Sequence, residues 1–548
     1  MDASTGDFAF LPLGGTGEIG MNLNLYRCAG RWLAVDCGIG FGGAAHPEVE
    51  VMMPDPAFIA ERRKALVGLV ITHAHEDHIG AVAHLWPQLQ CPVYATPFAA
   101  TVLRRKLAEA GLLDQVPVHT VPTGGSFALK PFRLQFIRMA HSVPESQALV
   151  IRTDAGIVLH TGDFKLDPEP MVGPQSDEAA LKALGDEGVL AMICDSTNAM
   201  VDGHSGSEGE VRRSLADLIR GLKGRVAVTC FASNVARVES VALAAKAAGR
   251  AVAIVGRSLK NLDAAARTCG YLKGIAPFLS EDEANDVDDD HLLILITGSQ
   301  GEARSALSRV AMDTHPRIEL GGGDNVIYSS RMIPGNERAI GTVQDNLVRR
   351  GVRLLTDDDH LVHVSGHPAR DELRRLYELV RPKFSVPTHG EWRHLSAHAA
   401  LAQELGITPI LLEDGDILDL TTAVPQVVDS APVAKLVLDG SRLVPLSGGV
   451  LGARRRMLFN GVVIASFAVD ANGKLVGAPK ISAPGLLEGE DPDTARIAQE
   501  LADAIGGLPA ALRQEDAPLL DAAKAALRRS LGRRLQKRPL VDVHLLRV

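Results

Sequence analysis

A run of metal-binding residue types stands at the end of a predicted strand. Residues 73–78 read His-Ala-His-Glu-Asp-His, so three imidazoles and two carboxylates fall within six positions. The apolar residues before them predict a strand over 66–72, and the residues after them predict a helix over 79–86. A loop between the two can direct alternate side chains to two neighbouring points, and imidazole and carboxylate donors suit borderline divalent ions such as zinc. We therefore predict a two-metal centre rather than a solvated polar loop, with ligands from His73, His75, Asp77 and His78.

Three more ligand-type residues follow predicted strands elsewhere in the chain. His141 follows FRLQFIRMA, Asp163 follows GIVLHTG and His389 follows FSVPT. Loops at strand ends often carry functional residues, although a single histidine in such a place is more often a hydrogen-bonded structural residue. Because the three would complete the centre, we predict that they converge on it. The histidines that lack this placement and are expected to be structural or surface residues are His84, His119, His160 and His394.

The rhythm of the predicted elements indicates an α/β protein of several domains. Short β-rich runs occupy residues 8–197, which is typical of two β layers with helices outside. From about residue 206 helices and strands alternate, and this alternation predicts a parallel, doubly wound domain. The strand-rich pattern of the first part returns at His360, so the segment of alternating helices and strands is inserted into the first domain. The predicted parts are a first domain (1–205, completed by 356–420), an inserted domain (206–355), a linker (421–450) and a small C-terminal α+β domain (451–548).

Composition narrows the class of protein. The 548 residues are 46% hydrophobic and 22% charged, as in globular proteins of several domains. Six cysteines are scattered without a C-x-x-C pair, which argues against a disulfide framework and against a thiolate zinc site. No signal peptide or membrane span is predicted, so we expect a cytoplasmic protein without membrane contact. The net charge of −9 means that any polyanion must be bound by a local basic patch.

A glycine motif near the N-terminus resembles a dinucleotide-binding fingerprint but lacks its context. Gly15-Thr-Gly17-Glu-Ile-Gly20 follows an apolar run, and Asp36 lies downstream. The segment after the glycines should then be a helix that binds pyrophosphate at its N-terminus. Instead MNLNLYRC alternates like a strand, so we do not predict nucleotide binding.

The predicted ligands, and their order along the chain, resemble those of the metallo-β-lactamase fold. The resemblance covers most of the chain. It implies that the first metal ion is bound by His73, His75 and His141, and the second by Asp77, His78 and His389. It implies that Asp163 bridges the two ions. Asp36 resembles the acid that orients ligating histidines in this fold. Each ligating imidazole needs such an acceptor outside the metal site. The alternative for Asp36 is a turn-capping residue before Gly38.

The inserted domain resembles the β-CASP insertion of nucleases. Cys194-Asp195-Ser-Thr197, Ser365-Gly-His367 and Pro387-Thr-His389-Gly-Glu391 are similar to motifs A, B and C of that group. Within it, the ribonuclease J family is most similar, on TCFASNVARVES, ITGSQGE, SSRMIPGNE and the C-terminal domain. Ala74 departs from the glycine frequent in that family. It is not a ligand, so only a stiffer loop is expected.

The resemblance implies a two-metal ribonuclease that makes 5′ phosphate and 3′ hydroxyl products. Zinc is the expected metal, with manganese as the alternative; such ions activate water and neutralise charge on phosphate. His367 is the predicted general acid and Asp195 the residue that orients it, whereas a helix N-cap is the alternative for Asp195. Chiefly 5′-to-3′ exonuclease activity in RNA maturation and decay is implied, with endonuclease activity beside it.

A pocket for the 5′ monophosphate is also implied, formed by Ser233, His363 and Ser365. His363 and Ser365 alternate with Val364 on a predicted strand, so their side chains should face the same way. Ser233 precedes a predicted helix, whose N-terminus suits a phosphate. The alternatives are an ordinary N-cap for Ser233 and a turn residue for Ser365.

RNA is the expected substrate, and the C-terminal domain is expected to form a homodimer or homotetramer, with LVDVHLLRV as a candidate edge strand. Proteins of an RNA-degradation complex are further expected partners. Two other functions are open. A small-molecule hydrolase of the lactonase or thioesterase type would not explain the insertion, and a non-catalytic scaffold would not need a ligand-type residue at every expected metal position.

Overall fold

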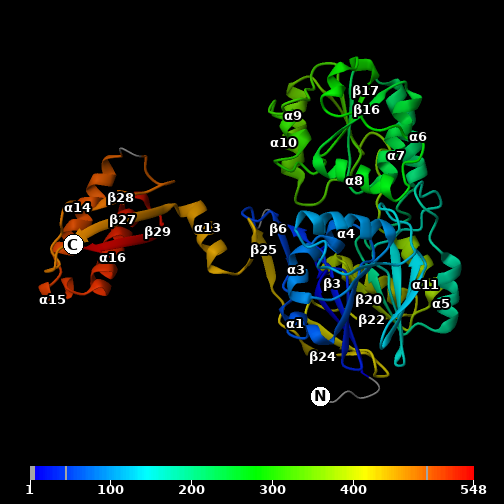
Figure 1. The fold of residues 1–548 in the computed structure, drawn as a ribbon, viewed down its shortest axis with the longest axis horizontal. Coiled ribbons are helices and arrows are strands. Elements are labelled where there is room, and N and C mark those ends of the chain that lie inside the picture. The colour runs from blue at the N-terminus through cyan, green and yellow to red at the C-terminus, as the bar shows by residue number, and fades with distance from the viewer. Residues whose placement is uncertain (1–6, 44–45, 489–490) are drawn as a thin grey trace. The chain divides into compact units, whose positions relative to one another are not determined.

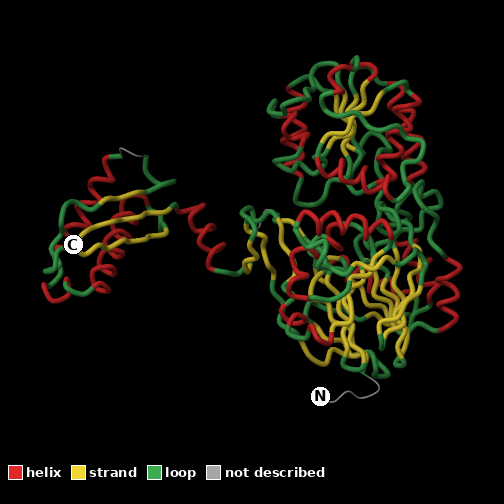
Figure 2. Tube along the Cα trace, in the orientation of Figure 1, coloured by secondary structure: helices red, strands yellow, loops and turns green. Residues whose placement is uncertain are grey.

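A computed structural model of the protein describes residues 7–43, 46–488 and 491–548. The chain divides into two compact units, one containing residues 7–43 and 51–436 and the other 46–50 and 437–548 (Figures 1 and 2). Among the described residues, no helix has the length and apolar character needed to span a membrane.

Two β-sheets form the centre of the first unit, and we call this part the sandwich domain. The spatial order of the first sheet is β24 (Gln426–Ser430), β23 (Asp416–Asp419), β1 (Phe8–Gly14), β3 (Leu23–Cys28), β4 (Arg31–Val35), β7 (Leu66–Val70), β8 (Val93–Ala95) and β9 (Val118–Thr120). That of the second is β10 (Ser126–Leu129), β11 (Phe132–Arg138), β12 (Gln147–Thr153), β13 (Gly156–His160), β14 (Ala191–Asp195), β20 (Phe384–Thr388) and β22 (Thr408–Pro409). Phe10 and Leu33 of the first sheet share one buried core with Phe136 and Ile193 of the second.

Helices cover the outer faces of both sheets. On the first sheet, α4 (Pro97–Glu109) contacts β8 and β9, α3 (Val82–Leu89) lies beside α4, and α1 (Ala57–Ala60) beside α3. On the second sheet, α5 (Glu178–Glu187), α11 (Arg370–Val380) and α12 (Trp392–Glu404) bury their apolar side chains against the strands. The predicted two-layer β core with helices outside is confirmed.

Between β14 and α11 the chain forms the inserted domain. Its sheet has the order β16 (Ala251–Val255), β17 (Leu292–Ile296), β15 (Val226–Thr229), β18 (Asn325–Tyr328) and β19 (Arg353–Leu355), with all pairings parallel. The helices around it are α6 (Glu208–Gly221), α7 (Val235–Ala247), α8 (Arg257–Thr268), α9 (Ala306–Ala311) and α10 (Glu337–Arg349). The predicted doubly wound domain is therefore confirmed.

A buried ion pair fixes the inserted domain to the chain that returns from it. Arg237 on α7 and Glu208 on α6 lie 2.9 Å apart, and both side chains are almost fully buried. The Arg237 guanidinium also donates to the carbonyl oxygens of Ser329, at 2.7 Å, and Val362, at 2.9 Å. The pair is thus fully hydrogen-bonded, which a buried charge requires.

Arg237→Met is expected to lower the free energy of unfolding by about 3 to 5 kcal/mol, because it leaves the Glu208 carboxylate buried without its partner. Urea unfolding measures this change. The matched control is Arg213→Met, which breaks the exposed Arg213–Glu169 pair and should change the free energy by less than about 1 kcal/mol. Equal effects of the two substitutions would contradict the prediction.

The second unit contains a sheet of order β28 (Lys480–Ser482), β27 (Val462–Val469) and β29 (Leu540–Arg547). Buried residues alternate along β27, and they pack against α14 (Pro492–Gly506) and α16 (Asp516–Leu535). The segment LVDVHLLRV forms β29, at the edge of this sheet as predicted. The other helices of this unit are α13 (Gly449–Asn460) and α15 (Ala510–Arg513).

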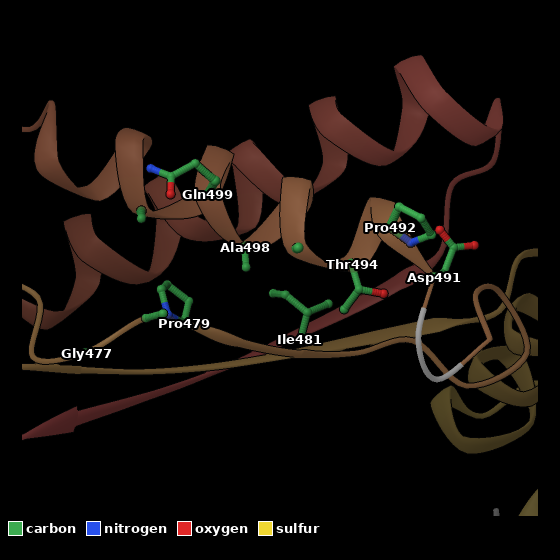
Figure 3. Close-up of a pocket in the computed structure, with 11 residues that line it drawn as sticks. Gly477, Pro479, Ile481, Asp491, Pro492, Thr494, Ala498 and Gln499 are labelled. Carbon is green, nitrogen blue, oxygen red and sulfur yellow. The ribbon is translucent and has the colours of Figure 1, made fainter.

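Two features of the chain's C-terminal part were not predicted. Residues 421–450, for which we predicted a linker, contain β24, β25 (Lys435–Asp439) and β26 (Arg442–Pro445), and β24 completes the first sheet of the sandwich domain. An open groove of about 590 Å³ runs along α14 and is lined mainly by small residues (Figure 3). It contains none of the predicted site residues.

Candidate metal centre

Three groups of potential metal ligands meet in the sandwich domain, and within each group the ligand atoms lie within 4.8 Å of one another. The first contains His73, His75, His141 and Asp163, and the second Asp77, His78, Asp163 and His389. The third contains Asp163, Asp195, His367 and His389. The structure thus brings together all seven predicted ligands, with Asp163 common to the groups.

The local fold around residues 73–78 differs in one respect from the prediction. Strand β7 ends at Val70, and the short helix α2 (Glu76–Ile79) begins directly after His75, so Asp77 and His78 lie on a helical turn and not on a loop. Carboxylates are favourable in the first turn of a helix. The Gly38 backbone packs against this turn, because a Cβ there would lie 1.7 Å from the Asp77 carbonyl oxygen.

The glycine motif that resembled a nucleotide fingerprint supports the centre instead. The segment after it is β3, as predicted, and β2 (Thr16–Gly17) pairs with β21 (Gly390–Glu391) next to His389. The His389 amide donates to the Gly15 carbonyl oxygen at 2.6 Å. Asn22 donates to the Asp77 carbonyl oxygen at 3.1 Å and contacts the His78 ring at 3.1 Å. The sequence did not single out Asn22.

Hydrogen bonds orient two of the ligand-type histidines. The Asp36 carboxylate lies 2.7 Å from His78 Nδ1 and accepts bonds from the amide and hydroxyl of Thr72. His141 Nδ1 lies 2.6 Å from the Gly366 carbonyl oxygen. A carbonyl can only accept, so Nδ1 carries the proton and Nε2 of His141 keeps its lone pair toward the centre.

The histidines of the centre are of two kinds, those whose pKa is lowered by burial and those whose pKa is raised by nearby carboxylates. Burial lowers the pKa of His73 and His141 well below the usual value, and that of His75 to about 4, so these rings are neutral. Burial also acts on His389, but the Asp163 carboxylate and other acids raise its pKa to about 10. Burial opposes ionisation of Asp163, yet His389 and His78 outweigh it and lower the pKa of this carboxyl. The acids are thus ionised, and divalent cations can replace the protons that balance them.

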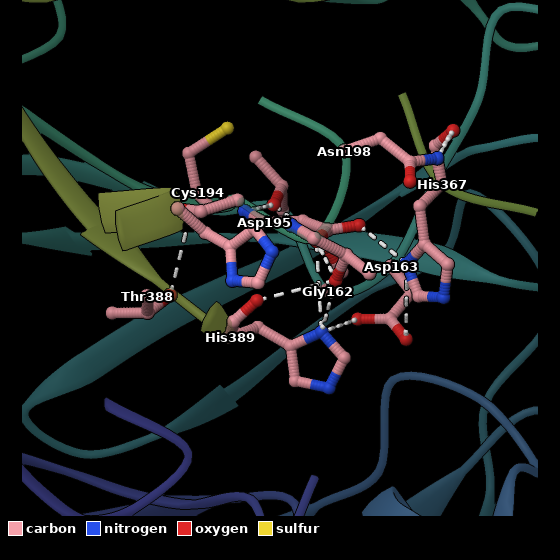
Figure 4. A network of polar contacts seen from close by, with 12 residues as sticks. Gly162, Asp163, Cys194, Asp195, Asn198, His367, Thr388 and His389 are labelled. Atoms are coloured by element: carbon pink, nitrogen blue, oxygen red, sulfur yellow. Dashed lines mark hydrogen bonds and ion pairs between the residues drawn. The ribbon is translucent and has the colours of Figure 1, made fainter. Parts of the chain in front are cut away.

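His367 and Asp195 form a pair beside this centre. His367 Nδ1 lies 2.8 Å from the Asp195 carboxylate and 3.8 Å from that of Asp163 (Figure 4). Burial lowers the pKa of His367, but Asp195 and Asp163 outweigh it, and the net shift is upward. Asp195 ends β14 and is followed by a turn, so it is not a helix N-cap. Its other carboxylate oxygen accepts from Thr197, whose hydroxyl also contacts His389.

The residues predicted to bind a 5′ phosphate lie where the inserted and sandwich domains join. Asn234, and not Ser233, caps α7, because its side chain accepts from the Arg237 amide at 2.8 Å. The Phe231 ring, in the loop before Ser233, packs on His363. Within the described structure His363 Nδ1 is buried without a hydrogen-bond partner. Burial lowers the pKa of His363 to about 3, and Arg237 and Arg331 add to the effect.

One expectation about this segment was wrong. Residues 361–365 lie outside the strands of the structure, because the Val362 carbonyl oxygen is bound by Arg237 and Ser329 instead of a neighbouring strand. Burial still alternates, with Val362 and Val364 buried and His363 and Ser365 half-buried. The Ser365 hydroxyl accepts from Asn198 at 2.8 Å and from the His367 amide at 3.2 Å, so it also serves as a turn residue.

Family models match four parts of the chain. The Ribonuclease J beta-CASP domain matches residues 223–347, and the beta-lactamase superfamily domain matches residues 31–209. The Zn-dependent metallo-hydrolase RNA specificity domain matches residues 359–412, and the Ribonuclease J C-terminal domain matches residues 449–548.

Similar proteins span nearly the whole chain. Ribonuclease J of Sinorhizobium meliloti is 42% identical over 551 residues, which cover 99% of this chain and 98% of the relative. Ribonuclease J of Mycolicibacterium smegmatis is 37% identical, with 98% of this chain and 96% of the relative covered. A solved structure of a protein of unknown function from Enterococcus faecalis has a TM-score of 0.52 at 14% identity, over 75% of this chain and 100% of that chain, so it shares the fold alone.

Proposed function

Because the chain belongs to the ribonuclease J family, we propose that it is chiefly a 5′-to-3′ exoribonuclease that prefers RNA with a 5′ monophosphate. The family membership makes it a metal-dependent ribonuclease, with a metallo-β-lactamase domain that carries a β-CASP insertion and a ribonuclease J C-terminal domain. We propose in addition the direction of degradation and the preference for one 5′ end. We also propose a role in RNA maturation and decay, with endonuclease activity beside the exonuclease activity.

The donor set fits two divalent cations, because it combines imidazole nitrogens with ionised carboxylates. One ion would be held by His73, His75 and His141, the other by Asp77, His78 and His389, and Asp163 would serve both positions. Zinc is the proposed metal and manganese the alternative. When bound, such ions activate water for attack and neutralise charge on the scissile phosphate.

His367 is proposed to protonate the leaving 3′ oxygen. The Asp195 carboxylate binds its Nδ1 and raises the pKa of the ring, which favours the protonated imidazole and leaves Nε2 to donate a proton. The proton passes to the 3′ oxygen as its bond to phosphorus breaks, which leaves a 3′ hydroxyl on one product and a 5′ phosphate on the other. Asp36 holds His78 in the same manner as Asp195 holds His367.

The unpartnered His363 Nδ1 is the observation that carries the proposal of a 5′-phosphate pocket. A buried polar atom without a partner is costly, and a phosphate oxygen would satisfy it. The Ser365 hydroxyl accepts two hydrogen bonds and keeps its own hydrogen for donation, and Ser233 adds a hydroxyl from the inserted domain. Arg237 and Arg331 both lower the pKa of His363, and the Arg237 charge is already paired with Glu208. A few donors match a monophosphate, whereas a triphosphate is larger and more highly charged.

The test compares otherwise identical RNAs that carry a 5′ monophosphate, triphosphate or hydroxyl. The wild type should degrade the monophosphate RNA at a rate at least about 10-fold higher than the rates on the other two RNAs. The double variant Ser233→Ala, Ser365→Ala should lose this difference. Ser466→Ala, in the second unit, is the matched control and should retain it. Equal rates of the wild type on all three ends would rule the pocket out.

We further propose that the second unit joins chains into a homodimer or homotetramer. Among the described strands, β29 lies at the edge of its sheet with one side unpaired, and its Leu546 is 60% exposed. RNA is the proposed substrate of the assembled enzyme, and we place it in the cytoplasm with other proteins of an RNA-degradation complex.

A further inference from the structure

Glu145 lies at a contact between the inserted domain and the loop that carries His141. The loop of residues 139–146 connects β11 to β12, and its Ser146 hydroxyl donates to the Asp163 carbonyl oxygen at 2.9 Å. The loop therefore carries one predicted metal ligand, His141, and contacts a second, Asp163. Glu145 has a φ of 63°, a left-handed conformation that is uncommon for a glutamate. Such strain persists only where the surroundings enforce it, and it often marks a functional position.

The Glu145 carboxylate is shared between two domains. One oxygen accepts from the Phe98 amide at 2.7 Å, in the first turn of α4 of the sandwich domain. The other accepts from the Tyr271 hydroxyl at 2.9 Å, in the segment that follows α8 of the inserted domain. The Thr96 side chain at the start of α4 makes no capping hydrogen bond, so Glu145 takes the place of the usual cap.

The surrounding contacts make this a defined interface. The Tyr271 ring packs edge-on against Phe98, with 5.8 Å between ring centroids. The Cys269 thiol contacts the Thr101 hydroxyl at 3.3 Å on the same side of α4. The inserted domain is thus held to the sandwich domain at this point as well as through the two chain crossings near residues 206 and 362.

We propose that Glu145 is a positioning residue that, by binding Tyr271, fixes the inserted domain next to the His141 loop and so sets the affinity of the enzyme for RNA. The reason is geometric. Ser233 belongs to the inserted domain and the metal ligands to the sandwich domain, so an RNA that engages both needs them at a fixed separation. This step rests on the proposed 5′-phosphate pocket. Loss of the contact weakens binding and leaves the chemical step and the metal content unchanged.

The test measures KM and kcat on a 5′-monophosphate RNA for Tyr271→Phe, Glu145→Asn and the double variant. Phenylalanine removes only the hydroxyl, and asparagine tolerates the left-handed conformation but is too short to reach Tyr271. Each single variant should raise KM by about 3- to 10-fold, as expected for one partly exposed hydrogen bond to a charged group. The kcat should stay within about 2-fold of wild type, since a change in KM alone indicates lost binding.

The double variant distinguishes a shared contact from two separate effects. If Tyr271 acts only through its hydrogen bond to Glu145, KM of the double variant should equal that of Glu145→Asn, whereas independent effects would multiply. Tyr94→Phe is the matched control, because the Tyr94 ring stacks on Phe127 and His119 inside the sandwich domain. An unchanged KM in Tyr271→Phe, multiplied effects, or loss of metal would overturn the proposal. Failure of the 5′-phosphate pocket would appear separately, as equal wild-type rates on the three RNA ends.

Discussion

Asp163→Ala is expected to lose both bound metal and ribonuclease activity, the latter by about 1000-fold or more. The reason is its place in the centre, since its carboxylate belongs to all three ligand groups and is the only one shared by the two proposed metal positions among the described residues. His75→Ala should have the same kind of effect at the first position alone. The measurement is metal stoichiometry by mass spectrometry, together with the rate on end-labelled RNA.

His160→Gln is the control for these two substitutions. His160 is also buried and close to Asp163 in sequence, but its ring contacts the Tyr26 hydroxyl at 2.9 Å and it belongs to none of the three ligand groups. It should retain both metal ions. Unchanged metal stoichiometry in Asp163→Ala and His75→Ala would contradict the assignment of ligands.

The location of the site was predictable because its residue types are scarce and its sequence spacing is short. Histidines crowded at the end of one strand had few structural explanations, and the other ligand-type residues stood at strand ends that the fold gathers at one edge of the sandwich. The inserted domain was predictable for a related reason. Its alternation of strand and helix differs in period from the strand-rich segments on either side.

Features that depend on contacts between distant residues were not predictable. The four-residue helix α2 is too short for a periodic pattern, and it forms because its ends are held by neighbouring segments such as Gly38. The bond between Glu145 and Tyr271 joins residues 126 positions apart. A glutamate and a tyrosine are common surface residues, so nothing in their spacing indicates a contact. Asn22 was not predicted to support the centre for the same reason, although its position close to the glycine motif could have indicated it.

The third ligand group can be explained in two ways, with His367 either as a metal ligand or as a proton donor. Its ring lies close enough to Asp163 and His389 to be counted with the potential ligands. However, Nδ1 is already bound to Asp195, and the side chain is 22% exposed, whereas those of His73 and His141 are fully buried. A partly exposed imidazole can reach a substrate, which suits proton donation, while fully buried ones such as His73 and His141 suit metal binding.

His367→Ala should therefore keep both metal ions and bind RNA with a KM near that of the wild type, while kcat falls by about 100- to 10,000-fold, the usual contribution of a general acid. Asp195→Asn should lower kcat by a smaller factor, because the imidazole remains but loses the carboxylate that raises its pKa. A substrate whose leaving oxygen needs no proton, such as an RNA with a 3′-bridging sulfur at the scissile bond, should restore most of the lost rate in His367→Ala. Such rescue depends on the leaving group and not on metal occupancy, so a variant that had lost a metal ion would not show it. If metal content falls instead, His367 is a ligand and the proton must come from another group.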